Sequence, residues 1–357
     1  MYSVQPLLVA LLGIGKIGRE LIRRTISSPN YRYVTLVDTS GALAKREGFS
    51  VRDLEEIVAL KERGGKLFEM EERHDYFESF DGVAGVEYDV LVDATDAQTY
   101  PLLYKALDQA HVVASNKKPI ADVPYPAFQE LTSKAERLGR VFDFGVTVGA
   151  GMRTPDLIKQ LGADGLERVE GCLSGTMNYL SQRLNERVAL STALKEAMNA
   201  PRYYTEPDPR VDLEGCDFAR KITIIARLCG RGIERSDVDV EGLVPLELRR
   251  VPIEVFLKHL PSLDEGMAKR VEKARAGDKA LWYVGTADLD HDEYSVGFRE
   301  IPLEDLIAGS GESDNVLKIY PRLWRRPVTI IGPGAGVPEA VTGMIAGLSR
   351  VRARAKA

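Results

Sequence analysis

Residues 7–24 contain the pattern that most restricts the fold of this chain. Leu7–Leu12 is an uninterrupted apolar run, which is typical of a parallel strand buried on both faces. It leads into Gly13-Ile-Gly-Lys-Ile-Gly18, and residues 19–24 then follow a helical pattern. A strand, a GxGxxG turn and a helix in this order are the fingerprint of a doubly wound α/β domain that binds a dinucleotide. A glycine-rich turn without a ligand is the alternative.

Each glycine of this turn has its own predicted role. Gly13 permits the tight turn, Gly15 allows a pyrophosphate to approach the backbone, and Gly18 allows the helix to pack closely on the strand. The free N–H groups at the helix start offer partial positive charge to phosphates. We therefore expect cofactor contacts from the whole turn, namely from Gly13, Gly15, Lys16, Ile17 and Gly18.

The end of the next strand bears on the choice of cofactor. A strand is predicted at Tyr33–Val37, and Asp38 ends it. An acid at this distance binds the ribose 2′-hydroxyl and favours NAD. A 2′-phosphate is the alternative, and four residues that follow are candidates to accept it: Thr39, Ser40, Lys45 and Arg46. The choice between NAD and NADP therefore stays open.

Residues 204–221 form an acidic loop that leads into a helix. Pro207 and Pro209 exclude a regular helix from the first half, because each lacks a backbone donor and restricts the preceding residue. From Glu214 onward apolar residues recur at helical spacing. Asp217 and Lys221 are four apart and lie on one face of that helix. A surface ion pair is the simplest interpretation; in the other, the loop binds a substrate ammonium group and Lys221 acts on a carbonyl.

Composition excludes several classes of function. The net charge is −5 without a basic cluster, so a nucleic-acid partner is not expected. No apolar run is long enough to span a membrane, and no basic segment precedes the first apolar run, so we expect a cytoplasmic protein without a secretory signal. The three cysteines and four histidines lack metal-ligand spacing, which argues against a zinc site.

The run Tyr-Thr-Glu-Pro-Asp-Pro-Arg, followed by Asp212 and by Gly215-x-Asp-x-Ala-Arg-Lys221, closely resembles the substrate loop and catalytic helix of homoserine dehydrogenase. Residues 171–179 are similar to the family's Gly-x-x-x-Gly-Thr-x-Asn-Tyr segment. The resemblance implies an α/β fold with two domains. A Rossmann-type doubly wound dinucleotide-binding domain would comprise 1–146, completed by 326–357. An α+β catalytic and dimerisation domain with a mixed sheet would comprise 147–325.

The activity that the resemblance implies is the NAD(P)-dependent interconversion of L-aspartate 4-semialdehyde and L-homoserine, within threonine, methionine and isoleucine biosynthesis. A homodimer is implied as well. Lys221 and Lys117 would be catalytic, with Asp217 orienting Lys221. Substrate contacts would come from Gly175, Thr176, Tyr204, Glu206, Asp212, Asp217 and Lys221.

The resemblance also implies contacts for cofactor and cation. Thr95 would lie near the nicotinamide, Lys117 would contact the cofactor, and Gly334 and Gly336 of a second strand–glycine turn would cover the pyrophosphate. A monovalent cation, Na⁺ or K⁺, would bind backbone carbonyls of Val148, Ala150 and Met152. Gly145 stands where the family usually has a glutamate, which removes one ligand from that site.

Two other functions fit parts of the sequence. Lys118-Pro119 is similar to the Lys-Pro motif of sugar- or polyol-type NAD(P) oxidoreductases, although Lys117 stands where that motif usually has an acid. A non-catalytic NAD(P)-binding sensor is the second. Neither function needs an acidic loop joined to Lys221.

Overall fold

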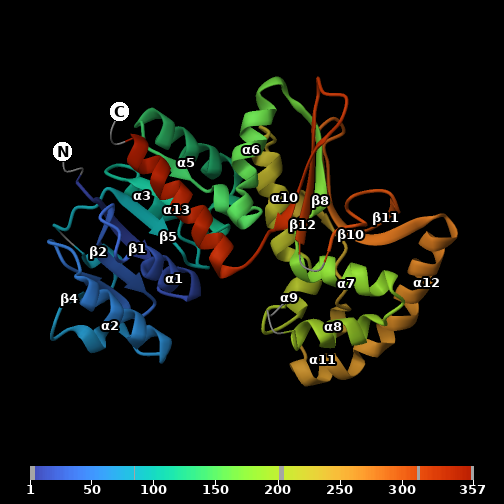
Figure 1. The fold of residues 1–357 in the computed structure, drawn as a ribbon, viewed down its shortest axis with the longest axis horizontal. Helices are drawn as coiled ribbons and strands as arrows, with labels where there is room; N and C mark the ends of the chain where they lie inside the picture. The colour runs from blue at the N-terminus through green and yellow to red at the C-terminus, as the bar shows by residue number, and fades with distance from the viewer. Residues whose placement is uncertain (1–4, 84, 201–204, 312–313, 355–357) are drawn as a thin grey trace. The chain divides into compact units, whose positions relative to one another are not determined.

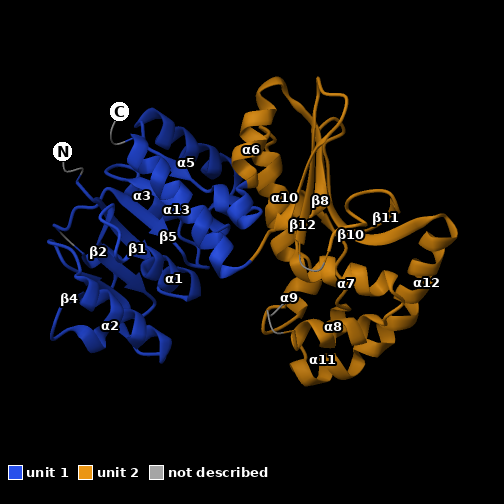
Figure 2. Cartoon of the chain, viewed as in Figure 1, with its two compact units in different colours: residues 1–153, 336–357 blue, residues 154–335 orange. Residues whose placement is uncertain are grey.

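The computed structural model describes residues 5–83, 85–200, 205–311 and 314–354. The chain divides into two compact units (Figure 2). Unit 1 contains Met1–Arg153 and Gly336–Ala357, and unit 2 contains Thr154–Ala335. Figure 1 shows the course of the chain through both.

Unit 1 is built on a seven-stranded sheet with the order β4-β3-β2-β1-β5-β6-β7. The neighbouring strands β2, β1, β5, β6 and β7 pair in parallel, whereas β3 pairs antiparallel with both β2 and β4. Its strands are β1 (Leu7–Leu12), β2 (Tyr31–Asp38), β3 (Gly41–Ala44), β4 (Asp75–Phe77), β5 (Val90–Asp93), β6 (His111–Ala114) and β7 (Phe142–Asp143). Its helices are α1 (Lys16–Thr25), α2 (Val51–Glu62), α3 (Tyr100–Ala106), α4 (Lys118–Ala121), α5 (Tyr125–Arg137) and α13 (Val337–Arg354).

The side chains of β1 alternate between two apolar layers. Leu7, Val9 and Leu11 pack in the same cluster as residues of α1, α2 and α13, whereas Ala10 and Leu12 pack with residues of α3 and α5. Successive residues of a strand point to opposite faces, so a continuous apolar run is required when helices cover both. The predicted doubly wound α/β arrangement is confirmed.

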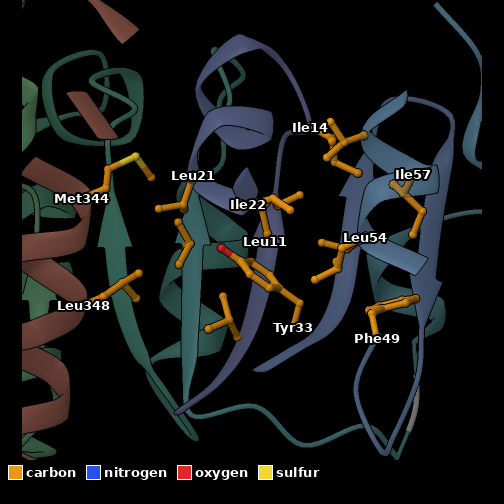
Figure 3. Packing of buried hydrophobic residues seen from close by; sticks show 14 of the residues in the cluster. Leu11, Ile14, Leu21, Ile22, Tyr33, Phe49, Leu54, Ile57, Met344 and Leu348 are labelled. Carbon is orange, nitrogen blue, oxygen red and sulfur yellow. The ribbon is translucent and has the colours of Figure 1, made fainter. Parts of the chain in front are cut away.

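The C-terminal helix α13 belongs to unit 1. Met344 and Leu348 lie in the same buried cluster as Leu11 and Leu21 (Figure 3). The strand before it, β13 (Val328–Pro333), pairs instead with β12 (Asp314–Pro321) in the sheet of unit 2. The division therefore falls after Ala335 and not after 325.

The first division falls after Arg153, whereas the boundary expected from sequence follows 146. Arg153 explains the difference. Its guanidinium pairs with the buried Asp143 at 2.7 Å and donates to the carbonyl of Gly343 in α13 at 2.5 Å. These contacts anchor the segment between 147 and 153 within unit 1.

Unit 2 is built on a six-stranded mixed sheet with the order β13-β12-β8-β10-β11-β9. Its remaining strands are β8 (Leu166–Cys172), β9 (Asp239–Val240), β10 (Lys279–Asp288) and β11 (Glu293–Pro302). Its helices are α6 (Thr154–Leu161), α7 (Gly175–Asn185), α8 (Leu190–Met198), α9 (Arg210–Leu213), α10 (Cys216–Leu228), α11 (Ile253–His259) and α12 (Asp264–Ala276). The alternating apolar runs at 281–286 and 294–299 lie in β10 and β11, which pair antiparallel.

Helix α10 packs directly on this sheet because the sheet has a glycine beneath it. A Cβ on Gly285 would lie 2.4 Å from a ring carbon of Phe218. Phe218 and Tyr283 also approach each other, with ring centroids 6.0 Å apart. This close approach places the start of α10 at one end of β8.

Within the described residues, no helix has both the length and the apolar character that crossing a bilayer requires.

Candidate active site

The glycine turn of unit 1 has the geometry that a pyrophosphate cradle needs. Gly13 has φ +91°, and a Cβ there would lie 2.8 Å from the carbonyl oxygen of Ala94. A Cβ on Gly18 would lie 2.0 Å from the carbonyl oxygen of Gly13. At Gly15, by contrast, a Cβ would meet nothing within 4 Å. Two glycines are therefore needed for internal packing, and the third faces open space.

Helix α1 begins at this open position. Lys16 is its first residue and is exposed, and Ile17 is half-buried. The N-cap, Gly15, has no side chain to bind the first N–H groups of the helix. Those groups and the helix dipole thus face the open side of Gly15, which suits a phosphate. The described residues of the turn fit a dinucleotide.

The carboxylate of Asp38 is already bound within unit 1. One oxygen accepts hydrogen bonds from the backbone N–H of Ser40 at 2.7 Å and from its hydroxyl at 2.6 Å. The other oxygen pairs with Lys61 of α2 at 2.5 Å. The contact of Lys61 with Asp38 was not predicted from the sequence, because no local pattern relates α2 to the end of β2. Lys45, a candidate for a 2′-phosphate, pairs with Asp53 at 2.9 Å.

Thr95 and Lys117 follow neighbouring parallel strands, β5 and β6. Thr95 donates to the carboxylate of the buried Asp93 through its N–H at 2.9 Å and its hydroxyl at 2.7 Å. Lys117 is the N-cap residue of α4 and is half-buried. Lys118, the lysine of the sugar-type alternative, is bound by the carboxylate of Asp96 at 3.0 Å.

The two C-terminal glycines lie in different units. Gly334 follows the edge strand β13 of unit 2, and a Cβ on it would lie 1.8 Å from the side-chain nitrogen of Asn315. Gly336 belongs to unit 1 and has φ +123°, and its carbonyl accepts the N–H of Ala340 at the start of α13. The predicted strand–turn–helix in one domain is therefore wrong, because β13 pairs with β12.

Lys221 is the central group of a cluster of polar residues in unit 2, which we call the half-site. It lies on α10 and is 8% exposed. Its ammonium donates to the carbonyl of Leu173 at 2.6 Å and pairs with Asp217 at 2.9 Å. The predicted contact between Asp217 and Lys221 forms. It is not a surface pair, because Lys221 is buried against the end of β8.

Asp212 lies on the short helix α9 within the acidic loop. Its carboxylate accepts the hydroxyl of Thr176 at 3.1 Å and the backbone N–H of Glu206 at 2.8 Å. Burial raises the pKa of Asp212 to about 6, and the negative charges of Glu206 and Asp217 act in the same direction. A buried carboxylate next to two further acids favours a cationic ligand.

The start of α7 contributes to the same half-site. Ser174 is its N-cap, and the Ser174 hydroxyl accepts the N–H of Met177 at 3.3 Å. Gly175 is the first helical residue. The hydroxyl of Thr176 binds Asp212, and Asn178 donates to the carbonyl of Asp314 at 2.9 Å.

Two other residues of the loop have different outcomes. Asp208 pairs with Arg210 at 2.6 Å, which holds the pKa of that carboxyl below its usual range. Glu206 is exposed. Tyr204, a predicted substrate contact, lies outside the described residues. Unit 2 thus brings together Lys221, Asp217, Asp212, Thr176 and the backbone at Gly175 and Glu206.

Known proteins share both the sequence and the fold of this chain. The family model for homoserine dehydrogenase matches residues 156–348. A homoserine dehydrogenase of Emericella nidulans is 30% identical over 372 residues, which cover 97% of this chain and 98% of that protein. The chain belongs to the homoserine dehydrogenase family. Its predicted family and its class as an NAD(P)-dependent oxidoreductase are confirmed.

Other matches extend the homoserine dehydrogenase assignment. The bifunctional aspartokinase/homoserine dehydrogenase of Haemophilus influenzae is 31% identical over 95% of this chain, which spans only 42% of that relative. Residues 2–99 also match the model for glutamate/leucine/phenylalanine/valine dehydrogenase.

Solved structures share the fold. A protein of unknown function from Candida auris has a TM-score of 0.85 at 26% identity and covers 98% of both chains. A hyperthermophilic archaeal homoserine dehydrogenase in complex with NADPH has a TM-score of 0.71 at 21% identity and covers 97% of both chains. The family match supports neither the sugar-type nor the sensor alternative.

The cation site that the homoserine dehydrogenase resemblance implies fits the described residues poorly. Ala150 has φ 44°, and its carbonyl already accepts the N–H of Arg153 at 3.1 Å. The nearby carboxylate, Asp143, is neutralised by two guanidinium groups, Arg153 at 2.7 Å and Arg350 at 2.9 Å. An alkali cation prefers several oxygen ligands, and Arg153 adds positive charge here. The site at Val148, Ala150 and Met152 stays a prediction.

Proposed function

We propose that this chain interconverts L-aspartate 4-semialdehyde and L-homoserine with NAD(P) as the cofactor, as part of amino-acid biosynthesis leading to threonine and methionine. The buried Lys221 beside Asp217, with Asp212 bound to Thr176, is the observation that carries the proposal. Unit 1 would bind the cofactor, and unit 2 would bind the substrate and contribute the proton donor.

Lys221 would stabilise the charge that develops on the substrate oxygen. The reduction needs a hydride at the aldehyde carbon, which a bound reduced nicotinamide supplies. Electrons of the carbonyl bond then move onto the oxygen. An ammonium group has three N–H donors, and two of those of Lys221 bind Leu173 and Asp217. The third can bind the substrate oxygen and transfer its proton, which completes the alcohol.

Asp217 would orient this ammonium group. It lies one helical turn before Lys221 and pairs with its ammonium group at 2.9 Å. In the oxidation of homoserine the same lysine would accept the proton from the hydroxyl, as microscopic reversibility demands. Lys117 would approach the same oxygen or the cofactor.

The acidic loop would recognise the amino-acid part of the substrate. Asp212 and Glu206 would bind the α-ammonium group, since both are carboxylates at the same turn of the loop. The N–H groups at the start of α7, at Gly175 and Thr176, would bind the α-carboxylate. Opposite charges at the two ends of the half-site would select a zwitterion over a simple aldehyde.

Exposed apolar side chains at the six-stranded sheet support the proposal of a homodimer. On the face opposite α10, Glu170 accepts a hydrogen bond from Tyr320 at 2.5 Å, and Lys318 pairs with Asp305 at 2.6 Å. The large apolar side chains of Leu303, Leu306 and Ile331 are exposed. Paired charges with exposed apolar groups around them are typical of an interface. A second copy of this face would cover it. The expected cytoplasmic location stays a prediction.

A direct assay tests the reaction. The purified chain is incubated with L-homoserine and either NAD⁺ or NADP⁺, and the absorbance of the reduced cofactor is followed. Formation of reduced cofactor is expected, and the ratio of the two rates reports the preference that Asp38 and its neighbours set. If a folded sample that binds the dinucleotide shows no turnover of homoserine with either cofactor, the proposed reaction is wrong.

A further inference from the structure

A buried carboxylate at the end of β5 has no role in the proposed chemistry. Asp93 is completely buried. Its first oxygen accepts the N–H and hydroxyl of Thr95, and its second accepts the hydroxyl of Thr99 and, at 3.0 Å, the side-chain amide of Asn116. Burial raises the pKa of this carboxyl, and the hydrogen bonds oppose the shift. A carboxylate held by neutral donors alone is costly in a core, which makes a purely packing role a poor explanation.

The amide of Asn116 joins this carboxylate to two loops. Besides Asp93, its nitrogen lies 2.7 Å from the carbonyl oxygen of Ala97 and 3.1 Å from the hydroxyls of both Thr95 and Thr99. An amide has two protons, so these four acceptors share them. The side-chain oxygen accepts the N–H of Lys118 at 3.1 Å. The loop after β5 and the loop after β6 are therefore held by one side chain.

Lys117 lies inside this arrangement. Asn116 before it is held by the network, and Lys118 after it is bound through its N–H by Asn116. The carbonyl of Lys117 accepts the N–H groups of Ile120 at 3.0 Å and of Ala121 at 2.8 Å. The backbone of Lys117 is consequently restrained on both sides.

The network lies where a parallel sheet binds its ligands. β1 is flanked by β2 on one side and by β5 on the other, which is the point at which the strand order reverses. A Cβ on Gly13 would lie 2.8 Å from the carbonyl oxygen of Ala94 and 3.0 Å from the Thr95 methyl group. Thr95 thus borders the glycine turn directly.

We propose that Asp93 and Asn116 are a positioning pair that presents Thr95 and Lys117 to the nicotinamide half of the bound cofactor. Neither residue need touch the reacting atoms; both act through the backbone and hydroxyl groups that they hold. The proposal rests on the proposed function for the role of Lys117, whereas the effect on cofactor binding does not depend on which substrate is used.

The charge of Asp93 is removed while its shape is kept in Asp93→Asn. One carboxylate oxygen is replaced by an NH2 group. This donor then faces another donor, either the Thr95 N–H or the Asn116 amide. We expect kcat to fall by roughly 10- to 100-fold, because small misplacements of catalytic groups have effects of this size. We expect the Kd for NADPH, from fluorescence titration without substrate, to rise several-fold, and the KM for homoserine to change by less than about twofold because the substrate half-site lies in unit 2.

Thr25→Val is the matched control for stability alone. Thr25 is a buried threonine of the same unit, and its hydroxyl is 2.7 Å from that of Tyr33. Its loss should lower the melting temperature and leave kcat and the NADPH Kd unchanged. Thr99→Val, which deletes one donor to Asp93, is the second variant should Asp93→Asn fail to fold. It should show a smaller loss in the same direction.

The reciprocal variant Asp93→Asn with Asn116→Asp restores an amide–carboxylate pair with opposite polarity. We expect it to recover part of the lost NADPH affinity. Unchanged kcat and NADPH Kd in folded Asp93→Asn and Thr99→Val would overturn the proposal. It would also be overturned if the losses of kcat and NADPH affinity were no greater than those in Thr25→Val at equal destabilisation. If the wild type binds NADPH without turning over homoserine, the proposed function fails, whereas weaker NADPH binding in Asp93→Asn would still support the pair.

Discussion

At the scale of single residues, burial decides what the charged groups of the acidic loop can do. Lys221 and Asp217 have the spacing of an ordinary surface pair, but Lys221 is 8% exposed and also binds the carbonyl of Leu173. Few conformations are open to an ammonium group held at two points. Its remaining N–H donor is directed by the protein before any substrate binds.

The first prediction concerns Lys221→Ala. We expect kcat to fall by roughly 10²–10⁴-fold, because the proton donor and the charge that stabilises the substrate oxygen are both lost. The Kd for NADPH should change little. Lys269→Ala is the control, since Lys269 forms a pair of the same spacing with Glu265 on the exposed face of α12 at 2.6 Å. Equal kcat in the two variants would remove Lys221 from the mechanism.

The second prediction concerns the pH dependence that Asp212 causes. Its folded pKa of about 6 means that the carboxylate becomes protonated as the pH falls through this value. Because binding of an ammonium group needs the charged form, kcat/KM for homoserine should fall roughly tenfold for each pH unit below it. In Asp212→Asn this fall of kcat/KM at acidic pH should be absent, and the KM for homoserine should be high over the whole pH range. If the fall of kcat/KM at acidic pH persists in the variant, another group causes the pH dependence.

The same shift makes a prediction for stability. A folded pKa raised above the unfolded value stabilises the fold fully only below the unfolded pKa of 3.8, and this contribution is lost as the pH rises through about 6. Relative to wild type, Asp212→Asn should therefore gain about 1–3 kcal/mol of unfolding free energy between acidic and neutral pH. Urea denaturation of both proteins across this range measures the difference.

At the scale of elements, the turn from β1 into α1 separates structural from functional glycines. Gly18 is needed because α1 lies on the carbonyl of Gly13, whereas Gly15 borders open space. Glycine is thus required for two different purposes in one motif, close packing at Gly18 and open space at Gly15. The distinction follows from the direction in which each missing Cβ would point.

Substitution of these two glycines gives the fourth prediction. Gly18→Ala should destabilise unit 1 by about 1–3 kcal/mol, since the new methyl group overlaps the backbone of Gly13. Gly15→Ala should change stability by less than about 1 kcal/mol, because its φ of −77° suits alanine. It should nevertheless weaken NADPH binding roughly tenfold or more, since the methyl group occupies the place of the pyrophosphate. Thermal unfolding and cofactor titration of both variants distinguish the two effects.

At the scale of the whole molecule, the chain leaves unit 1 once and returns once. Arg153 is the last residue before the first crossing, and Gly336 is the first residue after the second. The carboxylate of Asp143 pairs with both Arg153 and Arg350, so one buried group fixes the chain on both sides of the inserted unit.

The fifth prediction concerns assembly. Ile331→Asp places a charge on the exposed face of β13, and burial of an unpaired charge in an interface costs about 2–5 kcal/mol. We expect a dimer for the wild type and monomers for the variant in sedimentation velocity. Leu246→Asp is the control, because Leu246 is 76% exposed in unit 2 but is not on the sheet. A monomeric wild type would contradict the proposed dimer.

Much of the fold was determined by the sequence alone, because its signals are local. The apolar run Leu7–Leu12 with its glycine turn predicts β1 and α1, and the alternating runs at 281–286 and 294–299 predict a hairpin. The spacing of Asp217 and Lys221 predicts their contact. In each case the interacting groups are separated by few residues, so backbone geometry dictates the outcome.

Only the tertiary structure decided which distant groups meet. Lys61 pairs with Asp38, Asn116 binds Asp93, Thr176 binds Asp212, and β13 pairs in unit 2 and not in unit 1. No short pattern encodes these contacts, since each depends on the packing of elements far apart in the chain. The burial of Lys221 also depends on the packing of distant elements, and this burial distinguishes it from the exposed lysines of the chain.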